Sequence, residues 1–244
     1  QHCRSPQVYD LLDPRPRKDK ERSGGLQIKE HPVLGIHVQG LQQIVAGDAA
    51  KVQELMDLGQ KNRSVGSTDM NAESSRSHSV CLVTVHQKDT ENESKSCYAK
   101  LNLVDLAGSE RADRTGASGK RLKEGANINK SLTTLGSVIN ALVEQARGKK
   151  GVFIQYRNSK LTRVLQESLG GNALCTMLAT LSPALLNGKE TLSTLRYAAR
   201  AKTIKKTVTK NEESGQIDKL NEEVARLKKM LAEKATVPGV VQDD

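Results

Sequence analysis

The chain of 244 residues is long enough for one substantial domain, alone or with an appendage. Its net charge of +10 suits an extended acidic partner, such as nucleic acid, an anionic membrane or an acidic protein polymer. Only 2% of its residues are aromatic, which argues against nucleic acid because bases need stacking platforms, and no apolar stretch approaches the length of a transmembrane helix.

The first quarter of the chain predicts a loop, two strands and a helix. Residues 13–25 are charged, rich in Pro and end in two Gly, which indicates an exposed hairpin loop rather than core. Residues 26–29 and 36–38 alternate between apolar and polar, which predicts two strands of a small meander. A helix is expected over 49–60, with Asp48 as its N-cap and Gly59 as its stop.

The middle of the chain predicts two neighbouring strands and the main helix. Residues 80–85 and 99–106 are mostly apolar and are separated by a polar turn, so we expect antiparallel strands that carry two polar loops at adjacent ends. Residues 130–146 place apolar side chains at helical intervals, which predicts a helix with one face packed on the sheet.

The last third predicts two further helices, a strand and a coiled coil. A helix over 159–169 should end at Gly170 and Gly171, a buried strand should cover 174–181, and the last core helix should cover 189–201. Apolar residues then alternate at three and four within 215–234, which is typical of a short coiled-coil seam. A seam this short is marginal, because isolated helices of roughly 12–15 residues are barely stable in water.

Two polar blocks, residues 71–78 and 105–110, supply most of a γ-phosphate sensor. Asp105 follows an apolar run and precedes Gly108, a pattern by which nucleotide-hydrolysing folds hold Mg²⁺ and detect the terminal phosphate. Ser74 and Ser75 offer hydroxyls, and Arg76 can pair with a carboxylate such as Glu110. Each feature alone would indicate a turn or a loop, but their joint occurrence favours the sensor.

One expected component of a nucleotide site is missing from the chain. A phosphate-binding Walker loop needs Gly, four residues and then Gly-Lys-Ser/Thr. The Gly-Lys pairs at 119–120, 148–149 and 188–189 are not followed by Ser or Thr. Tight binding of ATP by this chain alone is therefore not expected.

The two polar blocks, together with residues 122–132, 156–162 and 194–202, resemble the kinesin motor domain family in content and order. The resemblance runs from Val8 to about Asn211, and several phrases are most similar to the kinesin-3 group. It implies an α/β fold of the kinesin P-loop NTPase type, with a central mixed β-sheet flanked by helices. Because residues 8–12 resemble an internal block of the family, we expect the motor domain in this chain to be incomplete, lacking its leading part with the Walker loop.

The resemblance divides the chain into four parts. It implies the C-terminal portion of a motor domain over 1–202, a neck linker over 203–214, a neck coiled coil over 215–234 that would pair with a second copy, and a flexible tail over 235–244. In the linker Ile204 and Val208 would dock and Asn211 would latch, although an unstructured tail is a serious competing interpretation.

The resemblance also assigns roles at the nucleotide site. Ser75 and Asp105 would hold Mg²⁺, the amide of Gly108 would contact the γ-phosphate of ATP, and Asn71 would join the nucleotide-binding set. Arg76 and Glu110 would form a salt bridge, with Ser74 helping to orient the attacking water. His78 is left out of the catalytic set, because a structural hydrogen bond behind the loop explains it at least as well.

A basic face and a switch complete the interpretation. A solvated surface is the usual meaning of such charges, but the resemblance implies that this face binds the acidic surface of tubulin in microtubules. Its residues are Lys123, Lys130, Lys149, Lys150, Arg157, Lys160 and Arg163. The loop over 116–125 would couple the γ-phosphate to a helix starting near Asn127 by an order–disorder change.

Three function classes follow from these observations. The leading one is a microtubule-stimulated ATPase motor of the cytoplasm and cytoskeleton, and the second is a non-catalytic microtubule-binding module. The third, a basic nucleic-acid binder, is disfavoured by the scarcity of aromatic residues. A Walker loop immediately before Gln1 would favour the motor over the module. Four widely spaced Cys indicate reduced thiols in a cytosolic protein rather than a zinc site.

Overall fold

The structure, a computed structural model, describes residues 7–15, 19, 23–32, 35–64, 77–88, 90, 97–108, 120–210, 224, 226 and 227. The chain divides into two compact units. The first comprises Gln1–Glu30, Ile36–Cys81 and Asn102–Val208, and the second comprises His31–Gly35, Leu82–Leu101 and Thr209–Asp244. The candidate site lies within the first unit.

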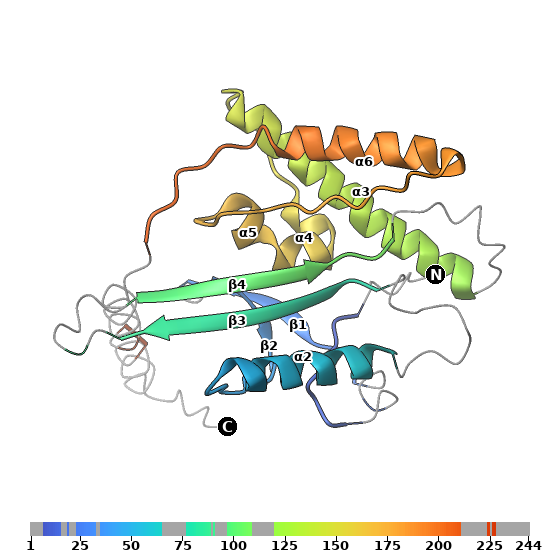
Figure 1. The fold of residues 1–244 in the computed structure, drawn as a ribbon. Coiled ribbons are helices and arrows are strands. Elements are labelled where there is room, and N and C mark those ends of the chain that lie inside the picture. The colour runs from blue at the N-terminus through green and yellow to red at the C-terminus, as the bar shows by residue number, and fades with distance from the viewer. Residues whose placement is uncertain are drawn as a thin grey trace, which may run out of the picture. The chain divides into compact units, whose positions relative to one another are not determined.

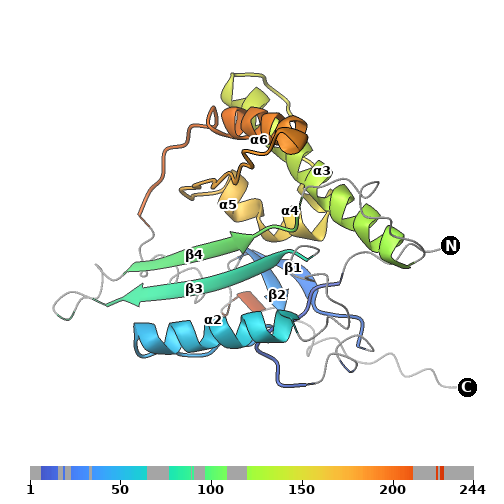
Figure 2. The ribbon, with the colours of Figure 1, turned by 45° about the vertical axis from the view of Figure 1, so that its right-hand side comes forward.

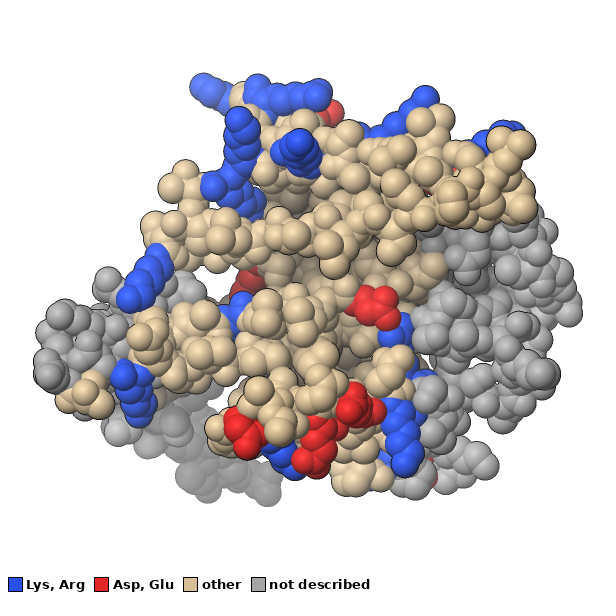
Figure 3. Space-filling view, viewed as in Figure 1, with Lys and Arg blue, Asp and Glu red and all other residues tan. Residues whose placement is uncertain are grey.

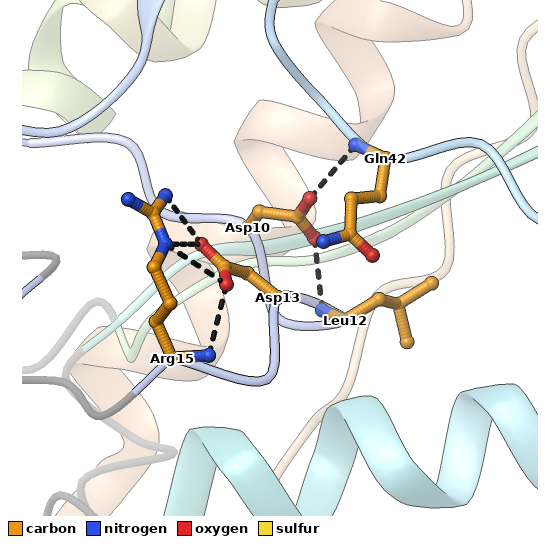
Figure 4. Close-up of polar contacts among 5 residues, drawn as sticks. All are labelled: Asp10, Leu12, Asp13, Arg15 and Gln42. Atoms are coloured by element: carbon orange, nitrogen blue, oxygen red, sulfur yellow. Dashed lines mark hydrogen bonds and ion pairs between the residues drawn. The ribbon is translucent and has the colours of Figure 1, made fainter.

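The first unit begins with a turn that is held by a carboxylate. Asp10 is buried and accepts hydrogen bonds from the backbone N–H of Leu12 and of Gln42, both at 2.8 Å (Figure 4). The expected strands are present as β1 (Gln27–His31) and β2 (Gly35–Gln39), which pair in a two-stranded sheet. Gly25, with φ of 75°, precedes β1 where a Cβ would lie 2.8 Å from the Val8 carbonyl oxygen, so this approach requires glycine.

The loop before β1 differs from its expectation at one of its described residues. Asp13 is buried rather than exposed, and its carboxylate accepts from both the backbone N–H and the guanidinium of Arg15 (Figure 4). A buried carboxylate needs such partners, because burial without them disfavours its charged form. The start of this segment therefore belongs to the packed part of the unit.

Helix α2 (Ala49–Ser64) is four residues longer than the expected 49–60. Asp48 caps it as predicted, because its Oδ1 accepts from the Lys51 N–H at 2.7 Å. The prediction that Gly59 ends the helix is wrong, since Gly59 lies buried within it. Contacts beyond Gly59 explain the extension: Asn62 donates from Nδ2 to the Leu11 carbonyl oxygen at 2.7 Å, and Arg63 binds residues far away in sequence.

Strands β3 (Ser79–Gln87) and β4 (Cys97–Asp105) form the second two-stranded sheet. Their arrows point in opposite directions in Figure 1, as the sequence predicts. The beginning of β3 and the end of β4 therefore meet at one end of the sheet, where the two polar blocks adjoin them. In the second unit, the rings of His86 and Tyr98 stack across this pair with centroids 6.3 Å apart.

Helix α3 (Lys120–Ala146) begins ten residues before the expected start at Lys130. Residues 120–125, which were expected to belong to a flexible switch loop, are helical, and the remainder of that loop lies outside the described residues. Lys, Arg, Leu and Glu are strong helix formers and dominate this stretch, which explains the longer helix. The apolar face of α3 confirms the predicted periodicity, because Leu135, Ile139 and Val143 are buried.

The core of the first unit lies where α3 meets the later helices. The predicted helix over 159–169 is divided at Leu165 into α4 (Lys160–Val164) and α5 (Gln166–Gly170), and both Leu161 of α4 and Leu165 between the two helices are buried in the core. Helix α6 (Gly188–Ala201) crosses α3 in Figures 1 and 2 and adds Tyr197 to this cluster. The expected stop at Gly170 and the last helix are both confirmed.

The prediction of a buried strand over 174–181 is wrong for this structure. These residues are all described, adopt no strand, and leave Leu174 and Leu178 more than 85% exposed. An apolar run becomes a buried strand only when a neighbouring strand accepts its backbone hydrogen bonds. No described residue pairs with this run in a sheet.

The structure describes only part of the neck region. In the neck region the described residues Val224, Arg226 and Leu227 are helical, whereas the rest of the expected coiled coil lies outside the described residues. Within the described ranges, no helix combines the length and apolar character that crossing a bilayer requires.

Candidate nucleotide-sensing site and basic face

Asp105 stands at the end of β4 with its carboxylate held from one side. Its Oδ2 accepts from Arg63 Nη1 of α2 at 2.5 Å, and the Asp105 side chain is 67% exposed whereas that of Arg63 is only 5% exposed. Asp105 Oδ1 has no hydrogen-bond partner among the described residues. The buried guanidinium thus orients a carboxylate that presents one oxygen to solvent, as a ligand for a hard cation must.

Arg63 also connects the Asp105 loop with the end of the Ser-rich block. Its Nη2 donates to the Ser77 carbonyl oxygen at 2.8 Å, and its Nε donates to Ser77 Oγ at 3.2 Å. A planar guanidinium suits this role, because it offers several donors in a fixed geometry. The residues directly before β3 and the residue that ends β4 are therefore anchored to the same side chain.

His78 lies between the Asp105 loop and α3. The Ala107 N–H donates to His78 Nδ1 at 3.0 Å, and His78 Nε2 lies 2.6 Å from Ser131 Oγ. Burial, with a contribution from the positive charge of Arg63, lowers the pKa of His78, and Asp105 acts in the opposite direction. The structural hydrogen bond that the sequence suggested for His78 is present.

The structure describes only some of the residues that the sequence predicts to bind nucleotide. Asp105 and Gly108 are described and lie together at the end of β4. The other predicted members lie outside the described residues: Asn71, Ser74, Ser75, Arg76 and Glu110. Their roles stay predictions.

The predicted basic face is distributed around α3 and α4. Lys and Arg side chains follow the edge formed by α3 and α6 in Figure 3, while Asp and Glu gather over α2. Lys130, Lys150 and Arg157 are exposed, and Lys149 is exposed but bonded to Glu144 at 2.8 Å. Lys160 is half-buried, and the Lys123 side chain lies outside the described residues although its backbone is in α3.

Arg163 is the member of this set that is least available to a partner. Its side chain is 15% exposed, and it donates to Glu30 Oε2 at 2.6 Å and to Gln166 Oε1 at 2.9 Å. Arg157 reaches the same Glu30 oxygen at 3.2 Å. Glu30 was not singled out from the sequence, because a single acidic residue in a strand carries no signal for partners so distant along the chain.

Within the first unit, the segment after α6 packs against the core. Ile204 packs on the core cluster formed by α3, α4 and Leu165, and its role as a docking residue of a neck linker stays a prediction. Lys206 donates from Nζ to the carbonyl oxygens of Leu169 and Gly171 at the end of α5. A cation suits this position, because helix carbonyls at the C-terminus are unpaired and carry partial negative charge. Val208 is half-buried, and Asn211 lies outside the described residues.

Sequence reasoning missed three residues of these arrangements, namely Arg63, Glu30 and Lys206. Arg63 carried a weak signal, because a basic residue in the last turn of a helix directly before the Ser-rich block was available to bind a carboxylate. Lys206 stood next to Lys205 in the sequence, and only the tertiary structure distinguishes the two.

Comparison with known proteins finds a family model and relatives that match most of this chain. The sequence model described as Kinesin motor domain matches residues 5–204. Human kinesin-like protein KIF1B is 50% identical over 236 residues, which cover 92% of this chain and 13% of that protein. Human kinesin-like protein KIF1C is 50% identical over 231 residues, which cover 92% of this chain and 20% of that protein.

Solved structures show the same relationship. A KIF14 dimer with AMP-PNP in complex with a microtubule has a TM-score of 0.77 and 48% identity, covering 84% of this chain and 57% of that one. A fast kinesin has a TM-score of 0.72 and 45% identity, covering 85% of this chain and 55% of that one. The chain thus spans a fifth or less of these curated relatives and little more than half of the solved motor chains. With the match extending over residues 5–204, the chain belongs to the kinesin motor domain family.

Proposed function

We propose that this chain forms the γ-phosphate-sensing and track-binding part of a motor that couples ATP hydrolysis to movement along microtubules. The observation that carries the proposal is the Asp105 carboxylate, oriented by Arg63 at the end of β4 beside the start of β3. Similar solved chains support it, since the KIF14 structures contain AMP-PNP or ADP in complex with a microtubule.

The described residues fit a divalent cation on one side of the nucleotide. Asp105 Oδ1 offers a hard oxygen ligand, which Mg²⁺ prefers. In this proposal Asp105 and Ser75 hold Mg²⁺, Gly108 contacts the γ-phosphate, and Arg76 pairs with Glu110. When bound, the ion would neutralise charge on the phosphates. The 244 residues contain no Walker loop, so the proposal assigns them only the γ-phosphate side of the site.

A second candidate is a microtubule-binding module without catalysis. Such a module needs no glycine-rich cradle for the α- and β-phosphates, and the 244 residues contain none. The orientation of Asp105 by a buried arginine favours the motor. A surface module would not need a carboxylate that is fixed and yet exposed.

Steady-state phosphate release by the complete protein, with and without microtubules, separates the two candidates. The motor predicts turnover that rises with microtubules and is lost in Glu110→Ala, while binding of a fluorescent nucleotide analogue persists. Glu54→Ala on α2, away from the proposed site, is the matched control and should behave as the unchanged protein. A protein that binds microtubules without any stimulated turnover would establish the module.

The basic face is tested separately by cosedimentation with microtubules. Neutralising Lys149, Lys150 and Lys160 should raise the microtubule concentration required for half-maximal binding, and raising the salt concentration should shrink the difference. No shift at low salt would place the track-binding surface elsewhere.

The remaining parts of the proposal concern the neck and the cellular setting. Residues 203–214 act as the linker that follows the motor domain, and 215–234 pair with a second copy through a short coiled coil. The matches to KIF1B and KIF1C support the kinesin-3 grouping. A protein with these functions works on cytoplasmic microtubules.

A further inference from the structure

One imidazole contacts two segments that the proposed function assigns to different tasks. His78 receives the Ala107 N–H on Nδ1 at 3.0 Å and lies 2.6 Å from Ser131 Oγ on its Nε2 side. A backbone N–H can only donate, so Nδ1 must be the unprotonated nitrogen. The neutral ring therefore carries its hydrogen on Nε2 and donates to the Ser131 hydroxyl.

Both partners of this imidazole are withdrawn from solvent. Ala107 and Ser131 are 5% and 4% exposed, so water cannot readily replace either bond. The lowered pKa of His78 keeps the ring neutral at neutral pH, which this hydrogen-bond pattern requires. The charged groups near the ring are Arg63, which opposes protonation, and Asp105, which favours it.

We call these two hydrogen bonds of His78 the bridge. Its two ends, Ala107 and Ser131, lie in segments to which the proposed function gives different roles. Ala107 lies two residues after Asp105 and directly before Gly108, in the loop assigned to Mg²⁺ and the γ-phosphate. Ser131 lies on α3, one residue after Lys130 of the basic face. Hydrogen bonds tolerate only a few tenths of an ångström before they weaken, so a shift of the loop must either break a bond or displace α3.

We propose that His78 is a positioning residue that makes the Ala107 amide and helix α3 move together, so that the state of the γ-phosphate reaches the basic face. The proposal rests on the proposed function and names the hydrogen bonds that would link the γ-phosphate loop to α3. A switch loop before α3 would act through its own ordering, whereas the hydrogen bonds of His78 act directly between two buried groups.

Amide hydrogen exchange in the complete protein tests the bridge without any reference to activity. Ser131→Ala removes the α3 end and should accelerate exchange at the Ala107 amide about fivefold, because local opening becomes easier. Ser137→Ala is the matched control, since the Ser137 hydroxyl donates to the Thr133 carbonyl oxygen within α3. Unchanged exchange at Ala107 in Ser131→Ala would overturn the bridge.

Turnover then tests whether the bridge carries coupling. Ser131→Ala should keep basal ATP turnover within about twofold and lower microtubule stimulation about fivefold, in the range of measured coupling effects. Ser131→Thr keeps a hydroxyl and should restore at least part of the stimulation. Full stimulation in Ser131→Ala would overturn the coupling. If microtubules do not raise the ATP turnover of the unsubstituted protein, the proposed function is refuted instead. Amide exchange at Ala107 would still show whether the hydrogen bonds of His78 link the loop to α3.

Discussion

Arg163 Nη2 donates to Glu30 Oε2 across 2.6 Å, although the two residues lie 133 positions apart in the chain. Arg157 reaches the same oxygen, so two arginines of the predicted track-binding face share one carboxylate. The hydrogen bond and charge of Arg163 lower the pKa of Glu30 below its ordinary value. The carboxylate is therefore ionised at neutral pH and competes with any acidic partner for these arginines.

Replacing Glu30 by Gln should tighten binding to microtubules. The change frees Arg157 and removes one negative charge from the basic face, and an exposed ion pair of this kind corresponds to about a twofold change in affinity. Cosedimentation at low salt measures the effect. Glu54→Gln is the control, because Glu54 pairs with Lys51 on α2 and makes the same change in net charge. Equal or weaker binding by Glu30→Gln would show that the carboxylate does not compete.

Replacing Lys206 by Met should loosen the segment that follows α6. The variant keeps most of the side-chain volume but loses the bonds from Nζ to the carbonyl oxygens of Leu169 and Gly171. Amide exchange over 203–208 should rise several-fold, because the segment would lose these two bonds to the end of α5. Lys205→Met is the matched control, since Lys205 is exposed. Equal exchange in both variants would contradict an anchoring role for Lys206.

Adding a methyl group at Gly170 should destabilise the first unit. A Cβ there would lie 2.1 Å from Tyr156 Oη and 2.9 Å from Tyr156 Cζ, so the ring must move. We expect Gly170→Ala to lower the free energy of unfolding by about 1–3 kcal/mol, as overpacking does. Urea denaturation measures the loss.

The second variant in this test is Tyr156→Phe. The Tyr156 hydroxyl is buried without a hydrogen-bond partner among the described residues, so its removal should cost under about 1 kcal/mol. The double variant should recover part of the stability lost in Gly170→Ala, because the closest atom is gone. Additive losses would show that the two residues do not collide.

Stability should depend on pH through His78. Its folded-state pKa lies below the ordinary value of about 6.5, so the unfolded chain binds more protons at that site below pH 6.5. The free energy of unfolding should therefore fall as the pH drops below about 6.5 and level off below the folded-state pKa. Urea midpoints between pH 5 and 8 measure this, and His78→Gln should lack the step. Identical profiles would contradict the assignment.

Local patterns were a good guide wherever one element decides its own structure. The apolar spacing over 130–146 and 189–201 predicted helices that the structure contains, and Asp48 was recognised as an N-cap. The stop expected at Gly59 failed, because Asn62 and Arg63 gain distant partners that extend α2. Contacts between segments far apart in sequence outweighed the weak helix propensity of one glycine.

The candidate site shows the same division. Asp105 and Gly108 were singled out from the sequence, because a carboxylate and a glycine after an apolar strand form a local motif, and their roles toward a nucleotide stay predictions. Arg63, which orients Asp105, was not singled out, because no pattern in the sequence around Arg63 indicates a contact with a residue 42 positions away. A strand over 174–181 failed for a related reason, since its hydrogen bonds depend on a neighbour that no local pattern specifies.

Sequence alone determined the kinds of element, the chemistry of the polar blocks and the family, since periodicity and ordered motifs are properties of short stretches. Only the tertiary structure decided which side chains meet: Arg63 with Asp105, His78 with both Ala107 and Ser131, and Glu30 with two arginines. These pairings depend on the path of the chain through space, because hydrogen bonds and ion pairs act over a few ångströms and not over positions in sequence.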